Sequence, residues 1–448
     1  MLCELLSKAN DLLWGRILLP CMIAIGVFLT IRLNFPQIRK FRRSFQLTVG
    51  KIFSAGNRKN RNFLSVWETA STALASTIGT GSIVGVAVAI KAGGPGVLFW
   101  MWVSAFLGMA VKYSEIILAM KYREKCSDGF YIGGPMLYLQ KGISSRFLST
   151  AFVLLCLSVS FCMGNCVQSN TIASVLMNQM NINPIFSGLF FTILAGVVIL
   201  GGAKRIASIN AKVVPFMSLI YIGFCVLILL LNLSALPEIF LEIFQEAFQL
   251  KPALAGSALS LLIPAMKNGF SKGIFSNEAG LGSAPIAHAS SASSEFEEQG
   301  AWGIFEVFFT TMVICTLTGF VILCSDSSMK ENYNAVQMTY RAFGEVFPRL
   351  GGAIVSLSTV LFSFSTILGW AFYGEICLRF LFHKFKAYCL IYRLMYVLAV
   401  FFGAMIQIDL IWLVSELANG LMALPNLIGV VILSGQIEAS LKNNQHLG

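Results

Sequence analysis

Long apolar runs separated by short polar segments make up most of this chain. A membrane-spanning helix needs about 20 predominantly apolar residues. Shorter or charge-dotted runs begin near residues 14, 66, 97, 253 and 394. Longer runs without Asp, Glu, Lys or Arg cover residues 147–178, 184–203, 213–237, 307–325, 350–374 and 417–437. The pattern therefore predicts an all-α polytopic membrane protein with about eleven transmembrane helices.

The composition agrees with a membrane protein and excludes several other classes. Of the 448 residues, 56% are hydrophobic and 12% are charged, whereas a soluble domain carries about 25% charged residues. A soluble globular protein and a disordered protein are therefore excluded. The histidines and cysteines form no cluster with metal-ligand spacing, and the chain lacks the phosphate-binding loop G-x-x-x-x-G-K-S/T.

Lys and Arg residues are distributed unevenly between the predicted loops. Segment 32–61 holds nine basic residues and no acidic ones, which is typical of a cytoplasmic loop. We therefore expect a multi-pass protein of the cell (inner) membrane with its N-terminus outside and its C-terminus in the cytoplasm. The first apolar run lacks the basic start and the cleavage site of a signal peptide, so we interpret it as a retained helix. The net charge of +11 then reflects orientation and not a nucleic-acid partner.

Two predicted spans carry signs of interruption. The second places Gly79, Gly81 and Gly85 among hydroxyl residues, and each glycine lowers helix stability by about 1 kcal/mol relative to Ala. Close helix packing is the alternative explanation for these glycines. The seventh span combines glycines at positions 269, 273, 280 and 282 with three charged residues, and a charge at membrane depth costs at least about 2.5–3.5 kcal/mol. We expect the backbone to unwind in both spans.

The positions of the two interruptions predict a transporter. Without the first helix they are the first and sixth of ten spans, so two halves of five helices insert with opposite orientation. Paired broken helices of this kind are typical of secondary transporters. Their free N–H groups attract a carboxylate and their carbonyls coordinate a cation, which suits a zwitterionic amino acid with Na⁺. The predicted organisation is an extra N-terminal helix (1–35), a basic cytoplasmic loop (36–65), a first repeat (66–235), a second, inverted repeat (236–435) and a cytoplasmic tail (436–448).

The same segments carry a family resemblance. Residues 77–87, 93–96 and 275–289 resemble the signature of the alanine or glycine:cation symporter family. The resemblance implies a leucine-transporter-like fold with an inverted repeat of five plus five helices, two discontinuous helices and one extra N-terminal helix. It also implies secondary active transport of alanine or glycine, with D-alanine as a further candidate, coupled to Na⁺ or H⁺. One departure is Ser82, where the family usually has Asn, so a cation contact at this position is doubtful.

The resemblance also implies binding residues. Thr80 and Gly81 would present amides to the substrate carboxylate, and Trp370 would cap a pocket of methyl size. Gln168 would contact the substrate, although interhelical hydrogen bonding is the alternative for a polar residue in that span. A Na⁺ site would combine the carbonyls of Ala75 and Ile78 with the hydroxyls of Ser365 and Thr366. The full expected substrate set is Thr80, Gly81, Gln168, Phe270, Ser271, Gly273, Phe275, Thr366 and Trp370.

Other charged residues have structural interpretations. Lys112 and Glu115 stand three apart on one predicted helix and are expected to pair. His288, at a helix end near the cytoplasm, is not expected to relay protons. Glu278 has two interpretations: it pairs with a lysine of its own span, Lys267 or Lys272, or it is a protonatable coupling group.

The sequence also bears on four rival functions. A channel would need a repeated pore-loop motif and an enzyme would need a catalytic motif, and neither is present in the sequence. A non-transporting amino acid sensor stays open, as does an H⁺-coupled permease. The preferred interpretation is a Na⁺-coupled symporter without catalytic residues or an organic cofactor. Its partners would be alanine or glycine, Na⁺ and the lipid bilayer, and we expect a monomer.

Overall fold

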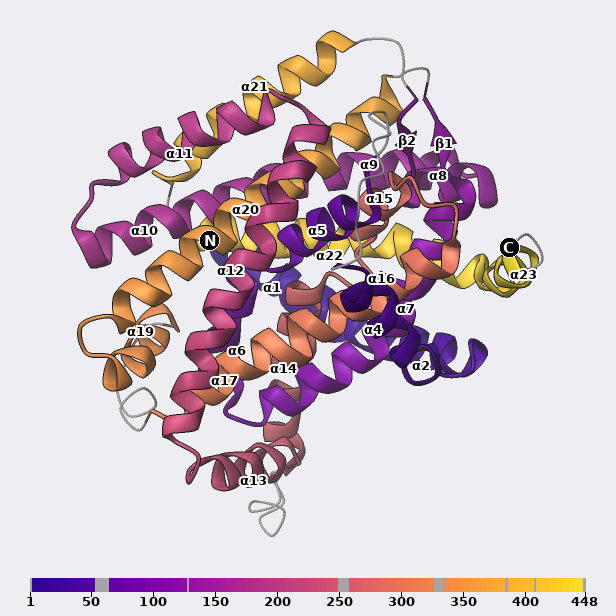
Figure 1. Cartoon of the computed structure of the whole chain (residues 1–448). Coiled ribbons are helices and arrows are strands. Elements are labelled where there is room, and N and C mark those ends of the chain that lie inside the picture. The colour runs from indigo at the N-terminus through magenta and orange to yellow at the C-terminus, as the bar shows by residue number, and fades with distance from the viewer. Residues whose placement is uncertain are drawn as a thin grey trace.

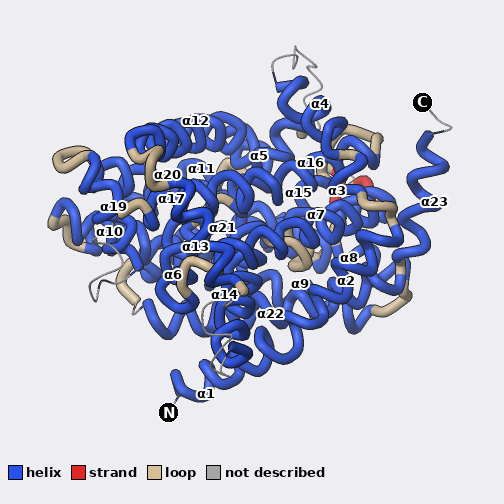
Figure 2. Tube along the Cα trace, turned by 90° about the horizontal axis from the view of Figure 1, so that it is seen from below, coloured by secondary structure: helices blue, strands red, loops and turns tan. Residues whose placement is uncertain are grey.

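The computed structural model is almost wholly helical (Figures 1 and 2). It describes residues 2–52, 64–126, 129–248, 258–325, 333, 335–382, 386–406 and 408–445. Within these residues the one sheet is a hairpin of two short antiparallel strands, β1 (Glu124–Lys125) and β2 (Tyr131–Ile132). The all-α expectation is confirmed.

Each predicted span corresponds to one helix or to two or three consecutive helix segments. Among the residues that the structure describes, seven helices are long and apolar enough to cross a membrane, and a bent pair of helices can form an eighth span. Two shorter apolar helices, α11 (Pro184–Ile199) and α21 (Lys386–Gly403), and the lysine-bearing α14 (Ala258–Asn277) correspond to the remaining three predicted spans.

The spans follow one another in the expected order. The N-terminal helix consists of α1 (Leu2–Asn10), η1 (Asp11–Leu18) and α2 (Leu19–Arg32). The next five are α5 (Val66–Thr77) with η2 (Gly81–Gly85) and α6 (Val86–Gly93), α7 (Val97–Tyr122), α9 (Arg146–Phe161) with η4 (Cys162–Val167) and α10 (Gln168–Met180), α11, and α12 (Ala203–Leu231). The last five are α14 with α15 (Ala284–Ala289), α16 (Phe296–Val307) with η6 (Phe308–Cys315) and α17 (Thr316–Leu323), α20 (Gly351–Leu381), α21, and α22 (Ile408–Ile432).

Several shorter helices lie outside these spans. The predicted basic loop contains α3 (Pro36–Arg39) and α4 (Phe41–Ile52), and Glu297 at the start of α16 pairs with Lys40 and Arg43 there. The predicted polar tail forms α23 (Ser434–Gln445), which packs against α7 and buries Ile437. The remaining short helices are α8 (Pro135–Leu137), η3 (Tyr138–Gly142), α13 (Leu236–Ala247) and α19 (Ala335–Val346).

Both expected interruptions are present, but the second is shorter than predicted. In the first, α5 ends at Thr77 and the chain bends by 48° before α6. In the second, α14 stays helical through Asn277, and the chain unwinds only between α14 and α15. Glu278 there has a φ of 56°, a left-handed conformation that L-residues seldom adopt. The expected unwinding at Gly269 and Gly273 is wrong, because both lie inside α14.

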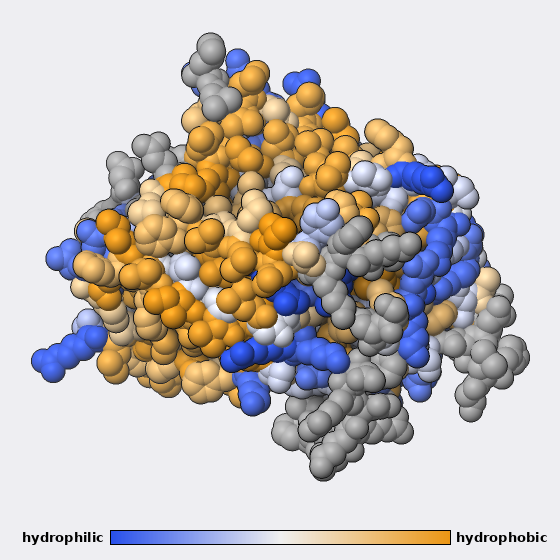
Figure 3. All heavy atoms as spheres, turned by 90° about the horizontal axis from the view of Figure 1, so that it is seen from above, coloured by the Kyte–Doolittle hydropathy of each residue, from blue (hydrophilic) through white to orange (hydrophobic). Residues whose placement is uncertain are grey.

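The outer surface suits a lipid environment. Exposed large apolar side chains line α11, α12 and α21, including Phe190, Leu219 and Phe402. Apolar residues cover much of the face in Figure 3. By contrast, α7 is buried along most of its length. It packs along α14 and α16 in the interior of the helical bundle and reaches the second break, where Lys112 contacts Asn277.

Candidate functional site

The first break releases two backbone carbonyls from the helix ladder. The N–H of Gly79 donates to the Thr77 carbonyl at 3.1 Å instead of to the Ala75 carbonyl one turn back. The N–H of Ser82 donates to Gly79 and not to Ile78. The carbonyls of Ala75 and Ile78 therefore lack the hydrogen bond that a continuous helix would give them.

Helix α20 places two hydroxyls against these carbonyls. Thr366 Oγ1 lies 2.9 Å from the Ala75 carbonyl oxygen and 3.5 Å from that of Ile78. Ser365 Oγ lies 3.5 Å from the Ala75 oxygen. All four residues are buried. The structure thus brings together the four residues predicted for a cation.

The hydrogen-bond inventory of this oxygen cluster favours a cation. Thr366 Oγ1 faces three carbonyl oxygens, those of Ala75, Ile78 and Phe362, yet a hydroxyl has one hydrogen to donate. Acceptors therefore exceed donors. A hard cation such as Na⁺ binds neutral oxygen ligands of this kind. It would coordinate the carbonyl oxygens that receive no hydrogen from the Thr366 hydroxyl.

Glycine at position 79 makes the approach of α20 possible. A Cβ atom there would lie 2.6 Å from Thr366 Oγ1, closer than real Cβ contacts. A side chain at this position would push the Thr366 hydroxyl away from the carbonyls. The same argument applies one turn further along α20, where a Cβ on Gly369 would lie 2.9 Å from the Ser76 nitrogen.

Polar groups at the start of η2, the second half of this broken helix, are suited to a ligand other than a cation. The N–H of Thr80 faces Gln168 Oε1 at 3.5 Å, the limit of a hydrogen bond. The other end of the Gln168 amide donates to the Met163 carbonyl at 3.2 Å. Thr80 Oγ1 is buried and has no hydrogen-bond partner among the described residues. A buried hydroxyl without a partner is costly, so a ligand that bonds to it would be stabilised.

Aromatic side chains enclose this region on the side of α14. A Cβ on Gly81 would lie 3.0 Å from a ring carbon of Phe275. The Phe275 ring stacks on Trp412 of α22 with 5.4 Å between ring centroids. Lys272, one turn before Phe275, pairs with Glu416 beside this stack and lies over both rings. The sequence analysis missed Trp412, because a single Trp in an apolar span carries no local signal.

The other α14 residues of the predicted set lie on different faces of that helix. A Cβ on Gly273 would lie 2.2 Å from Ser104 Oγ, so this glycine permits close packing against α7. Phe270 is buried with its ring 6.4 Å from that of Trp100, and Ser271 is half-buried. Of the α14 set, Phe275 is the residue that contacts the first break.

Trp370 lies at the second break. Its Nε1–H donates to Glu278 Oε1 at 3.2 Å, and its Cβ lies where a side chain on Gly164 would stand. Ser283 also donates to Glu278. The expected pairing of Glu278 with a lysine of α14 is wrong, because Lys267 pairs with Asp11 and Lys272 with Glu416.

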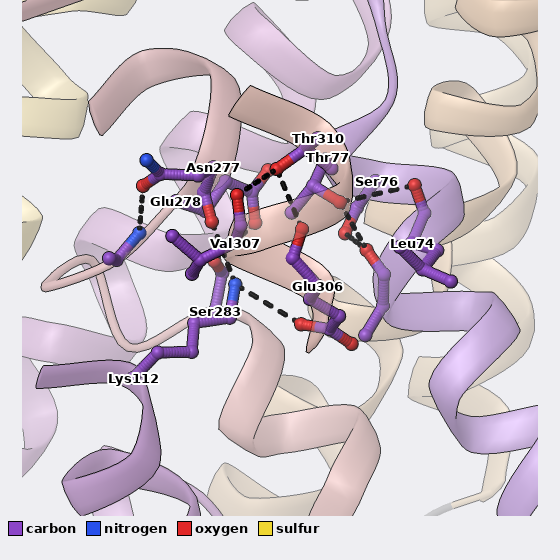
Figure 4. A network of polar contacts seen from close by, with 12 residues as sticks. Leu74, Ser76, Thr77, Lys112, Asn277, Glu278, Ser283, Glu306, Val307 and Thr310 are labelled. Atoms are coloured by element: carbon purple, nitrogen blue, oxygen red, sulfur yellow. Dashed lines mark hydrogen bonds and ion pairs between the residues drawn. The ribbon is translucent and has the colours of Figure 1, made fainter. Parts of the chain in front are cut away.

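A buried lysine holds the end of α14 (Figure 4). Lys112 Nζ donates to the Asn277 carbonyl at 2.8 Å and pairs with Glu306 Oε2 at 3.3 Å. Both charged side chains are fully buried. The expected pair Lys112–Glu115 is wrong: Glu115 accepts a hydrogen bond from Asn426 of α22 instead. Spacing along the helix predicted Glu115 as the partner of Lys112, but the packing of α7 against α16 brings Glu306 to it instead.

Ser82 contacts its surroundings through hydrogen bonds. Its Oγ lies 3.1 Å from Ser276 Oγ, and its carbonyl accepts from Thr318 Oγ1 at 2.9 Å. Ser276 Oγ in turn lies 3.0 Å from Cys315 Sγ. These small polar groups join η2 to α14, η6 and α17.

Comparison with known proteins places the chain among transporters. The sequence profile of the sodium:alanine symporter family matches residues 1–446. A sodium/alanine symporter of Methanococcus maripaludis is 37% identical over 446 residues, covering 98% of this chain and 96% of that protein. A probable sodium/glutamine symporter of Bacillus subtilis is 34% identical, covering 98% and 90%.

Solved structures share the fold at low identity. The transporter MhsT in complex with L-phenylalanine has a TM-score of 0.61 at 12% identity, covering 85% of this chain and 92% of that one. A Na⁺-coupled sialic acid symporter has a TM-score of 0.55 at 13% identity, covering 89% and 82%. The likeness confirms the expected leucine-transporter-like architecture.

Proposed function

Because this chain belongs to the sodium:alanine symporter family, and so is a multi-pass membrane transporter and not an enzyme, we propose that it carries alanine or glycine across the membrane together with Na⁺. The observation that carries the proposal is the oxygen cluster at the first break. The carbonyls of Ala75 and Ile78 and the hydroxyls of Ser365 and Thr366 are neutral. Such ligands bind Na⁺ without releasing protons, whereas an H⁺ site needs a group that titrates.

The substrate site is proposed next to the cation site. The N–H groups of Thr80 and Gly81 open the second half-helix, where the helix dipole favours a carboxylate. Gln168 Oε1 and the free hydroxyl of Thr80 supply acceptors for an ammonium group. The contact of Gly81 with Phe275 leaves little room for a side chain, which favours alanine and glycine. One methylene is worth about 1–3 kcal/mol in such a pocket, so both are expected to be accepted.

Transport follows by alternating access. Na⁺ would bind the two released carbonyls and the two α20 hydroxyls, and so join α5 to α20. The amino acid would then occupy the space between Thr80, Gln168 and Phe275. Lys272 and Glu416 would close the site on the side of Trp412. The driving force is the Na⁺ gradient plus about 2.3 kcal/mol per charge per 100 mV.

Uptake of radiolabelled alanine into proteoliposomes tests this function. Uptake above the equilibrium level is expected with an inward Na⁺ gradient. Replacing Na⁺ by choline at two pH values separates the ions: uptake that persists in choline and rises at acid pH would overturn Na⁺ coupling in favour of an H⁺-coupled permease. Binding without uptake would indicate a sensor.

We further propose the inner-membrane location, a monomer, the repeat boundaries given above and a cytoplasmic C-terminus. The basic residues of α3 and α4, among them Arg39, Arg42 and Arg43, support a cytoplasmic position for that end. Cys3 is exposed, so a membrane-impermeant maleimide added to intact cells should label it from outside. A C3S variant is the control for labelling of other cysteines. Labelling at Cys3 only after the cells are opened would show that the N-terminus lies inside, opposite to the proposed orientation.

A further inference from the structure

A sharp turn follows the first membrane-spanning helix. That span ends at Arg32, and Asn34 and Phe35 after it adopt left-handed backbone conformations with φ of 53° and 56°. The Phe35 N–H donates to the Thr30 carbonyl at 2.7 Å, and Gln37 Nε2 donates to Thr30 Oγ1 at 3.0 Å. The helices α3 and α4 therefore begin close to the level where the span leaves the bilayer.

One face of α4 packs against α16 and the start of η6. The ring of Phe41 lies 4.9 Å from that of Phe308, and Ser44 and Thr48 are buried on the same face of α4. The ion pairs of Glu297 described above hold the beginning of α4 in place. This packing leaves the opposite face of α4 at the edge of the helical bundle (Figure 2).

The outward side of this segment carries an open hollow. Its volume is about 480 Å³, and it is lined by Arg39, Arg42, Arg43, Gln46 and Leu47. Spacings of three and four residues place these side chains on one side of α3 and α4. All of them except Leu47 are exposed. The hollow therefore presents three guanidinium groups to whatever surrounds the protein.

The positive charge of this hollow is only partly balanced by the protein. Glu297 is shared between Lys40 and Arg43, at 2.7 Å and 3.3 Å. Among the described residues, Arg39 and Arg42 form no ion pair. An arginine side chain can donate two parallel hydrogen bonds to the oxygens of a phosphate group. The unpaired guanidinium groups are therefore suited to a phosphate.

Exposed apolar side chains precede these arginines along the chain. Ile31 at the end of α2, Phe35 in the turn and Ile38 of α3 are exposed, Ile38 by 60%. They continue the exposed apolar surface of the span, which includes Val27 and Phe28. In a membrane such a surface contacts acyl chains, whereas a dissolved phosphate would make no use of it. The surroundings of the hollow thus favour a phosphate that carries lipid tails.

We propose that the hollow binds the phosphate of an anionic phospholipid such as phosphatidylglycerol, with the acyl chains along Ile31, Phe35 and Ile38. Arg39 and Arg42 donate to the phosphate oxygens. A zwitterionic headgroup carries a cation beside its phosphate, which the arginines repel, whereas an anionic headgroup is attracted to basic residues at the membrane surface. The lipid site is separate from the substrate and cation sites, and it does not depend on the proposed transport.

Photo-cross-linking tests this site. A phosphatidylglycerol analogue with a diazirine in one acyl chain is added to the full chain in detergent, and the cross-linked peptides are identified by mass spectrometry. We expect cross-links within residues 31–47 that unlabelled phosphatidylglycerol prevents. Equal competition by phosphatidylcholine with the same acyl chains would overturn the role of the arginines. Equal competition by glycerol 1-phosphate, which has no acyl chains, would make the hollow a site for soluble phosphate and overturn the lipid assignment.

Removal of the two unpaired cations provides the decisive comparison. In R39Q/R42Q the analogue concentration for half-maximal cross-linking should rise by about 30-fold, since each arginine at an anionic surface strengthens binding by about fivefold. R146Q/R205Q is the matched control, because both arginines are exposed on other helices and the same charge is removed; its affinity should be unchanged. Thermal unfolding checks that both variants are folded.

Two results of this comparison would overturn the proposal. One is an unchanged affinity in R39Q/R42Q, and the other is an equal loss of affinity in R146Q/R205Q. Because cross-linking needs no transport, failure of the lipid site and failure of the proposed function are distinguishable.

Discussion

The two breaks differ in what satisfies their free peptide groups. At the first, the released carbonyls of Ala75 and Ile78 face, among the described residues, only small neutral hydroxyls. At the second, the Asn277 carbonyl is held by the ammonium of Lys112. The second break also contains Glu278, bound by Ser283 and Trp370. Neutral partners leave room for an external cation, whereas fixed side chains occupy the place that a ligand would take.

This difference assigns different tasks to two similar interruptions. A break whose acceptors outnumber its donors is suited to binding. A break held by buried charges is suited to controlling the angle between two half-helices, because any rearrangement must keep those charges paired. The residues that a ligand would contact are therefore expected at Ile78–Gly81, with Phe275 as the contact contributed by α14.

The largest expected effect comes from removing the charge at the second break. K112M leaves Glu306 buried without its cation, which costs about 3–5 kcal/mol. We expect strong loss of folded protein, measured by thermal unfolding in detergent. K121M, near the exposed end of the same helix, should be close to neutral. Normal stability of K112M would contradict the assigned role of the lysine.

The next effect concerns the substrate side of the first break. G81V places methyl groups where Phe275 stands, and we expect substrate binding to fall by about 5- to 150-fold, since overpacking costs about 1–3 kcal/mol. Isothermal titration with alanine measures this. Gly85 meets nothing within 4 Å, so G85A is the matched control. Normal alanine binding by G81V would show that the substrate site does not include Gly81.

A smaller effect is expected at the cation ligands. T366V keeps the shape but removes the hydroxyl, and a hydrogen-bonding contact to a charged group is worth about 1.5–3 kcal/mol. The Na⁺ concentration for half-maximal uptake should rise by about 10- to 100-fold. T366S should retain Na⁺ affinity, and S363A should too, because Ser363 Oγ has no partner among the described residues. If T366V and the unmodified chain show the same Na⁺ dependence, Thr366 is not a cation ligand.

The smallest effect is expected at the partly exposed pair of Lys272 and Glu416. An ion pair of this exposure is worth about 0.2–1 kcal/mol, so K272Q should change uptake by about two- to fivefold. The charge exchange K272E/E416K should recover part of the loss. If uptake by K272E/E416K is no higher than uptake by K272E alone, the pair of Lys272 and Glu416 does not close the site.

The first break was largely predictable from the sequence. Glycines on both sides of Thr80 and hydroxyls near position 366 are local signals, and the structure brings them together. The second break was predicted too long. Gly273 allows α7 to approach, whereas Gly280 and Gly282 adopt positive φ. A glycine required for packing and one required for unwinding look the same in a sequence.

Charge pairing was the least predictable feature. Lys112 has Glu115 three residues away, yet it pairs with Glu306 across the bundle. Spacing along one helix says which groups share a face, not which neighbour is packed against that face. For the same reason no local pattern indicated that His288 and Glu306 would meet, or that Trp412 would stack on Phe275.

The position of Lys112 has a mechanical consequence. Its ammonium binds the backbone of α14 and a side chain of α16 while its own helix packs along both. Separating α7 from α14 or α16 would leave a buried charge of Lys112 or Glu306 without its partner in an apolar interior that cannot solvate it. The three should therefore travel as one rigid body during the cycle. Spin labels on α7 and α16 should keep a constant separation while their distance to α20 changes.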